Sequence, residues 1–191
     1  MNAIMKSLKL PGATIEVVLA PGVADRQLTP LFSCGGLVLS QVCQLSGLEG
    51  YTVQNWIKRK ILTPPVKKKY SRYQLCRIFN INVLKDTFTL EQASTLLGCI
   101  NGNLNNTIDG VIDDSRLYTY LVDCLAELNY SDLIDLNRIG ETVRAVTADY
   151  CNSHQGSEIR LRMVLEIMLT ACQAQQIHHR ALEMFRRMDN M

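Results

Sequence analysis

The chain has 191 residues, of which 47% are apolar and 20% charged, and its net charge is +2. This length and composition suit one compact domain or two small ones. No apolar run reaches the roughly 18–20 residues that a membrane-spanning helix needs, and the N-terminal residues lack the apolar segment and cleavage site of a secretory signal. We therefore expect a cytoplasmic protein that makes no membrane contact.

The number and spacing of the cysteines also fit a cytoplasmic protein. There are seven of them, scattered among apolar neighbours, and no two are spaced as C-x-x-C. An odd and scattered set is typical of reduced, buried thiols and not of a disulfide framework.

The charges are distributed unevenly along the chain. The segment from Gly50 to Lys85 contains nine Lys or Arg and no Asp or Glu. From Asp86 to the end there are eight Arg against fifteen Asp and Glu. A basic block beside an acidic remainder indicates a polyanionic partner that binds one face of the molecule only.

Residues 1–36 carry the weakest signals, and we treat them as an N-terminal arm. Pro11, Pro21 and Pro30 interrupt any long element. The segment ATIEVVLA (13–20) is rich in branched residues and reads as a short strand, or equally as an extended arm that packs on the body.

Residues 37–98 carry the clearest local pattern. A first helix is expected from a cap at Ser40 to Gly47, because glycine accepts the left-handed conformation that ends a helix. A second helix is expected from about Tyr51 to Lys60, with Val53, Trp56 and Ile57 on its apolar side. Its other side presents amides and cations, as a recognition helix does in the DNA major groove, or as any solvated helix face does.

A loop with three consecutive lysines follows the second helix. Ile61 to Val66 is expected to be extended because residues before proline avoid the helical region. Lys67, Lys68 and Lys69 repel one another unless an anion lies close, and DNA phosphates would neutralise them.

Further helices account for the rest of the chain. Ser71 with Gln74, and Thr89 with Gln92, have the spacing of capping boxes, so helices are expected to begin at both places. The helix after Ser71 should bury Leu75, Ile78, Phe79, Val83 and Leu84, and the helix after Thr89 should stop at Gly98.

Later helices are expected at 115–128, 136–150 and 158–188, after a structural turn at 101–110 that fails the spacing of a calcium-binding loop. The last helix is apolar nearly all round in its first half, which fits a core helix or a subunit interface, and polar in its second half.

No constellation of residues points to catalysis. His178 and His179 are adjacent and cannot face one metal ion in the i, i+4 manner. There is no nucleophile motif and no glycine-rich phosphate loop. We therefore expect no enzymatic activity, no catalytic or metal-binding residues and no cofactor.

The same residues carry a resemblance to a known family. The shared motifs are QNW-K at Gln54–Lys58, PPVKKKYSR at Pro64–Arg72, INVLKD at Ile81–Asp86, and INGNL with IDDSRLYTYL further on. In these motifs the chain resembles the bacterial domain-of-unknown-function family 1836, common in Firmicutes, and more loosely the MerR-like winged helix. The MerR pattern has an arginine where this chain has Gln54, a tyrosine pair at Asn55-Trp56 and a glycine at Lys60, so the phosphate contact of that arginine is not carried over.

The resemblance implies a mainly all-α fold, in which a MerR-like winged helix-turn-helix (37–98) precedes a compact C-terminal helical bundle (99–191). It also implies a DNA-binding transcriptional regulator whose partner is double-stranded DNA. The residues expected to contact DNA are Tyr51, Gln54, Asn55, Lys58, Arg59, Lys67, Lys68, Lys69 and Arg72.

Two other readings stay open. In the first, the chain is a protein-interaction adaptor that keeps the fold without binding DNA. In the second, the C-terminal helices sense an effector of unknown identity, in a pocket lined by Tyr118, Tyr120, Tyr130 and Tyr150. A homodimer through the C-terminal helices is compatible with each reading.

Overall fold

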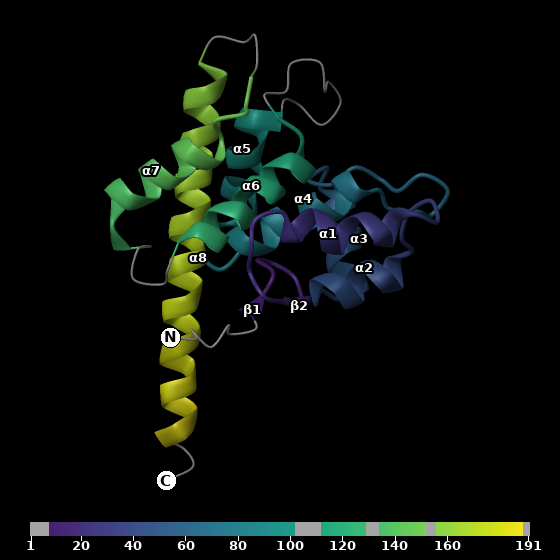
Figure 1. Cartoon of the computed structure of the whole chain (residues 1–191). Coiled ribbons are helices and arrows are strands. Elements are labelled where there is room, and N and C mark those ends of the chain that lie inside the picture. The colour runs from purple at the N-terminus through teal and green to yellow at the C-terminus, as the bar shows by residue number, and fades with distance from the viewer. Residues whose placement is uncertain (1–7, 102–111, 129–133, 152–155, 189–191) are drawn as a thin grey trace.

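The computed structural model describes residues 8–101, 112–128, 134–151 and 156–188. Figure 1 shows a mainly helical molecule, as the sequence predicts, in which the long helix α8 stands along one side of the body. The elements are β1 (Leu8–Lys9), β2 (Glu16–Val17), α1 (Val23–Leu28), the 3₁₀ turn η1 (Thr29–Phe32), α2 (Leu39–Ser46), α3 (Gly50–Lys58), α4 (Arg72–Leu84), α5 (Leu90–Asn101), α6 (Asp114–Glu127), α7 (Leu136–Val146) and α8 (Ser157–Met188).

Helix α4 is the centre of the core. It contacts α2, α5, α6 and α8, and every residue from Gln74 to Leu84 is buried. Its capping box forms as predicted, because the Ser71 N–H donates to Gln74 Oε1 (2.8 Å) and the Gln74 N–H to Ser71 Oγ (3.3 Å). One cluster of buried apolar side chains includes members from all three predicted segments. The proposed boundaries between those segments stay a prediction.

Four polar side chains of α4 are buried together with the predicted apolar face: Gln74, Arg77, Asn80 and Asn82. Arg77 pairs with Asp114 at the start of α6, with 3.5 Å between Nη1 and Oδ2, and both side chains are at most 2% exposed. Asn80 Nδ2 donates to Asp114 Oδ1 (3.0 Å). Asn82 Nδ2 donates to the carbonyls of Gly12 (2.8 Å) and Ser46 (3.0 Å). These contacts tie α6, α2 and the N-terminal segment to the central helix.

The N-terminal residues form more structure than their sequence indicates. Within the segment 13–20, Glu16–Val17 form the strand β2, which pairs antiparallel with β1 in the register Leu8 to Val17. Gly12, in the turn between them, has φ +66°, and a Cβ there would lie 2.3 Å from the Phe79 carbonyl oxygen. A glycine is therefore required where this hairpin crosses α4. Helix α1 and η1 were not expected, and α1 packs on α6.

Several helix boundaries differ from the prediction, and α3 ends at Lys58 and not at Lys60. The N-cap of α2 is Val38, two residues before the expected Ser40, and the Val38 N–H donates to Gln41 Oε1 (3.0 Å). Helix α5 continues through Gly98 because Leu97 before it and Ile100 after it are both fully buried. Helix α7 ends at Val146 and not at Tyr150. Most of the turn predicted at 101–110 lies outside the described residues.

Helix α8 packs on the body with its first half and extends past it with its second (Figure 1). The first half buries Leu161, Leu165 and Met168, so it is a core helix on that side. From Gln176 to Met188 every residue is exposed. None of the helices in the described segments is long and apolar enough to cross a bilayer.

The expectation of buried thiols holds for only three of the seven cysteines, and Cys43 is half-buried. Burial raises the pKa of Cys76, Cys124 and Cys172 to about 12 each, so these thiols carry almost no thiolate at neutral pH. Cys34, Cys99 and Cys151 are exposed. We expect a maleimide reagent at pH 7.5 to modify the exposed three rapidly, and the buried three only after denaturant is added. Peptide mass spectrometry of samples quenched over time would measure this, and rapid labelling of Cys76 in native protein would contradict the packing around α4.

Candidate nucleic-acid interface

The geometry of this surface begins with the α2–α3 pair. Helix α2 ends at Gly47, which has φ 70° and whose N–H donates to the Cys43 carbonyl (2.8 Å). Helix α3 starts only three residues later, after the N-cap Glu49. It is held against the core by Val53, which is fully buried, and Trp56, which is 4% exposed. The apolar side predicted for this helix is thus the side that anchors it.

The opposite side of α3 faces solvent, as expected. Tyr51, Gln54, Asn55 and Lys58 are all exposed, and Tyr51 exposes 74% of its surface. This face offers a phenol, two carboxamides and an ammonium group within two helical turns. Carboxamides donate and accept hydrogen bonds at once, which is the chemistry that reads base edges.

The lysines after α3 form a tight hairpin (Val66–Lys69, the basic hairpin). Val66 and Lys69 pair as an antiparallel bridge, and the Lys69 N–H donates to the Val66 carbonyl (2.9 Å). The two residues at the turn, Lys67 and Lys68, have φ of 49° and 62°. Positive φ at both central residues is the geometry of a type I′ turn.

The base of the basic hairpin is fixed to the segment before α2. The Leu37 N–H donates to the Tyr70 carbonyl (2.9 Å), and the Tyr70 N–H donates to the Leu37 carbonyl (2.7 Å). Leu37 and Tyr70 are each 3% exposed, so this bridge is anchored in the core. In Figure 1, α2, α3 and the segment that joins α3 to α4 lie on the far side of the body from α8.

The backbone of the basic block is strained. Among the residues that the structure describes, the non-glycine residues with positive φ are Lys60, Lys67 and Lys68. A left-handed conformation costs an L-residue about 1–2 kcal/mol, and asparagine and glycine are the residues that tolerate it. The chain thus keeps a cation at three places where a neutral residue would be more stable.

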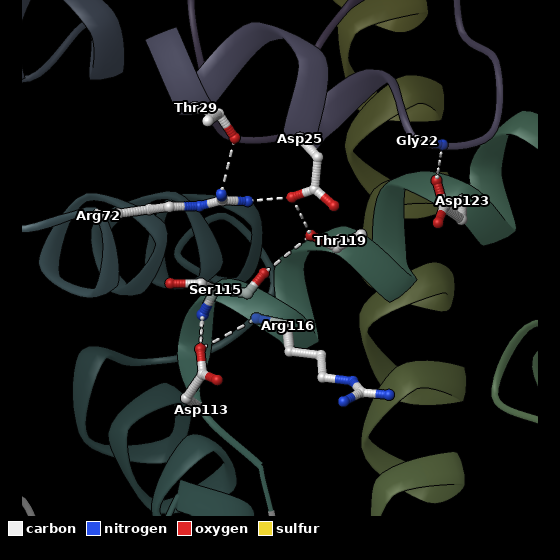
Figure 2. Close-up of polar contacts among 9 residues, drawn as sticks. All are labelled: Gly22, Asp25, Thr29, Arg72, Asp113, Ser115, Arg116, Thr119 and Asp123. Carbon is white, nitrogen blue, oxygen red and sulfur yellow. Dashed lines mark hydrogen bonds and ion pairs between the residues drawn. The ribbon is translucent and has the colours of Figure 1, made fainter. Parts of the chain in front are cut away.

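The two arginines of the predicted set already have carboxylate partners. Arg59 Nη2 lies 3.0 Å from Glu91 Oε1, and both side chains are largely exposed. Figure 2 shows Arg72 reaching from α4 to α1 and η1, where its guanidinium donates to Asp25 of α1 and to Thr29 Oγ1 of η1 (3.1 Å). Asp25 also accepts from Thr119 Oγ1 of α6 (3.2 Å). Arg72 therefore links three helices, which its position next to the lysines did not indicate.

A polar cleft of about 580 Å³ lies beside Arg72. Arg116, on α6, pairs across it with Asp149 (2.9 Å) and donates to the Tyr120 hydroxyl (2.9 Å). The residues that line this cleft come from α1, α4, α6 and the end of α7, so no short sequence motif predicts the cleft. The ion pairs Arg72–Asp25 and Arg116–Asp149 join segments that are far apart in the chain, which is the pattern of a structural network.

The tyrosine pocket considered from the sequence is not formed by the described residues. Tyr118 is fully buried, and its hydroxyl donates to the Pro11 carbonyl (2.8 Å). The Tyr120 hydroxyl donates to Asp149 Oδ1 (2.7 Å). Tyr130 lies outside the described residues. Within the described segments no group of three or more His, Cys, Asp or Glu side chains could hold a metal ion.

Comparison with known proteins gives a family match for the middle of the chain. Residues 36–121 match the family model described as "Domain of unknown function (DUF1836)". The chain is also similar to the uncharacterized protein YkrK of Bacillus subtilis (strain 168), at 26% identity over 98 residues, which is 49% of this chain and 42% of that protein. The chain thus spans less than half the length of this relative, and no solved structure matches it. The expected resemblance to family 1836 is confirmed over 36–121, and none of these matches supports the MerR likeness.

Proposed function

We propose that α2, α3 and the basic hairpin act as a winged helix-turn-helix that binds double-stranded DNA, and that the chain is a transcriptional regulator acting in the cytoplasm. The observation that carries the proposal is the set of strained lysines at Lys60, Lys67 and Lys68. Strained backbone lowers stability, so strain that is kept at a surface indicates a function at that place. Three cations in strained conformations lie beside a helix that exposes carboxamides. This combination fits a polyanion whose base edges can be read by hydrogen bonds, as in duplex DNA.

In this proposal the two parts of the surface have different tasks. Tyr51, Gln54 and Asn55 would face base edges in the major groove, where carboxamides pair with adenine. Lys58 and the lysines of the basic hairpin would contact phosphates, which position the protein without reading sequence. The acidic helices would stay away from the duplex because like charges repel.

The arginines would contribute unequally. The ion pair of Arg59 with Glu91 is exposed, with Glu91 83% exposed, so it is worth at most about 1 kcal/mol and can be exchanged for a phosphate contact. Arg72 is held by Asp25 of α1 and Thr29 of η1 and would need to leave them. We therefore rank Arg59 above Arg72 as a phosphate contact.

The test is a salt titration of binding to a fluorescent random-sequence duplex, followed by anisotropy. With about five phosphates neutralised per chain, the slope of log K against log salt should lie near −4 to −5. A variant with Lys9 and Lys85 changed to Ala, outside the proposed surface, is the matched control and should keep that slope. Absence of binding at low salt and micromolar protein would reject the proposal.

Asn55 should govern sequence preference and not general affinity. Selection of bound duplexes from a random library would give a consensus for the parent chain. We expect Asn55→Ala to relax the consensus at one or two positions, at a cost of about 1–3 kcal/mol against the best site, while random-sequence binding is nearly unchanged. An unchanged consensus would place Asn55 outside the reading surface.

One observation favours the adaptor alternative. Tyr51 and Val66 are 74% and 75% exposed, and tyrosine is enriched among the residues that carry binding energy in protein interfaces. An acidic protein would then occupy the surface in place of DNA. Tyr51→Ala and Val66→Ala should leave the salt slope unchanged if DNA is the partner, since neither side chain carries charge.

A further inference from the structure

Helix α8 has two apolar faces, and the core covers only one of them. Leu161, Leu165, Met168 and Cys172 are buried on the side that meets the body. The opposite side is exposed over nearly its whole length. We name this side the outer stripe; its members are Ile159, Met163, Ile167, Thr170, Ala174, Ile177, Ala181, Met184 and Met188.

The outer stripe has the spacing of a helix-packing seam. From Met163 onward its members follow one another at intervals of four and three residues, which keeps them on one side of a helix over several turns. Met163, Ile177, Met184 and Met188 are 56%, 54%, 61% and 68% exposed, and no charged residue interrupts the stripe. An exposed apolar strip of this length marks a contact surface.

The two halves of the outer stripe differ in shape. Along the first half lies a hollow of about 310 Å³, whose lining includes Phe88, Met163, Ile167 and Thr170. The second half stands clear of the body in Figure 1 and presents Met184 and Met188. One chain thus carries both a receiving groove and a protruding apolar helix that fits such a groove.

We propose that the outer stripe binds the outer stripe of a second copy in antiparallel orientation, so that the projecting half of each α8 fills the hollow of the other. In a twofold arrangement the hollow of each copy receives the projecting half of the other, so both halves of both outer stripes are covered. The seam positions then meet in one register: Ile177 opposite Ala174, Ala181 opposite Thr170, Met184 opposite Ile167, and Met188 opposite Met163.

Charge selects this register. Arg180 and Arg187 border the projecting half of the stripe on the same edge on which Glu166 borders the first half. In the proposed register Arg187 lies opposite Val164 of the other copy, two residues from Glu166, and Arg180 lies opposite Ala171, five residues from Glu166. The heptad shift that brings Ile177 opposite Ala181 places Arg180 within two residues of Arg180 of the other copy, where like charges repel. A parallel pair would leave both hollows empty.

The first test is the mass of the full chain by sedimentation equilibrium. We expect a dimer, and we expect Ile177→Glu with Met184→Glu to raise its dissociation constant by at least about a hundredfold, because the seam would bury unpaired carboxylates. The matched control is Gln176→Glu with His179→Glu, two exposed positions off the stripe on the same turns, which should leave the dimer intact. A monomeric parent, or a dimer that survives the stripe variant, overturns the proposal.

The second test fixes the orientation by oxidation to a disulfide. Cys34, Cys99 and Cys151 are first changed to Ser, since they are exposed. In that background Thr170→Cys with Ala181→Cys should give a covalent dimer. A covalent dimer from Ala181→Cys alone would indicate a parallel pair, and one from Ile177→Cys with Ala181→Cys the shifted register; either result overturns the proposed geometry. Both tests are made without DNA, so their outcome is independent of duplex binding.

Discussion

Replacing Asp114 by Ala is expected to lower the free energy of unfolding by about 3–5 kcal/mol, the largest effect on stability that we predict. Asp114 is fully buried, and its carboxylate accepts from Asn80 (3.0 Å) and pairs with Arg77, which is 2% exposed. Without the carboxylate, the Arg77 guanidinium remains buried without its counter-charge. The same carboxylate contributes to the raised pKa of Tyr73, second to burial, which places a third α4 side chain in this network.

Urea denaturation followed by circular dichroism at one protein concentration would measure the loss. The neighbouring Asp113 is the matched control, because it caps α6 by accepting from the N–H groups of Ser115 (2.7 Å) and Arg116 (3.1 Å) but is exposed. Asp113→Ala should cost about 1 kcal/mol.

A double variant, Arg77→Met with Asp114→Leu, removes both charges from the core. It should recover most of the lost stability, because apolar side chains of similar volume replace buried ion pairs at little cost. A loss for Asp114→Ala no larger than for Asp113→Ala would mean that Arg77 finds another partner in the native state.

This network illustrates what the sequence could not supply. The boundaries of α4 were predictable because the Ser71–Gln74 box and the apolar spacing are local signals. The burial of Arg77 and Asn80 was not, since it depends on Asp114, 37 and 34 residues further along the chain. Helix α1 was missed for a related reason: six residues between two prolines are stabilised by packing on α6 and not by their own propensity.

The candidate site likewise has features that the sequence could predict and features that it could not. The exposed face of α3 followed from a 3.6-residue period, which one short segment displays. The left-handed lysines did not follow, because nothing local to a Lys-Lys pair predicts positive φ; the bridge between Leu37 and Tyr70 imposes the hairpin from outside. The first half of α8 is apolar on two faces, so only the packed structure separates the core face from the outer stripe.

The largest effect on function is expected from the basic hairpin. Changing Lys67, Lys68 and Lys69 to Ala should weaken binding to any duplex by on the order of 500-fold at about 0.1 M salt, because each lysine–phosphate contact contributes roughly 0.9 to the log–log slope. The slope should become less negative by about 2.7, and the consensus sequence should not change. Anisotropy titrations over a range of salt concentrations would measure both quantities, and an unchanged slope would remove the hairpin from the interface.

A second variant separates charge from fold. Lys67→Asn with Lys68→Gly places the preferred type I′ residues in the turn, so the protein should gain about 1–2 kcal/mol of stability as the left-handed strain at φ 49° and 62° is relieved. Duplex affinity should nevertheless fall by on the order of fiftyfold at about 0.1 M salt, since two phosphate contacts are lost. A more stable protein that binds less well cannot be explained by unfolding, and this combination identifies the lysines as functional. If the variant gained stability and bound DNA as tightly as the parent, the strain would have no function in duplex binding and the proposal would lose its main support.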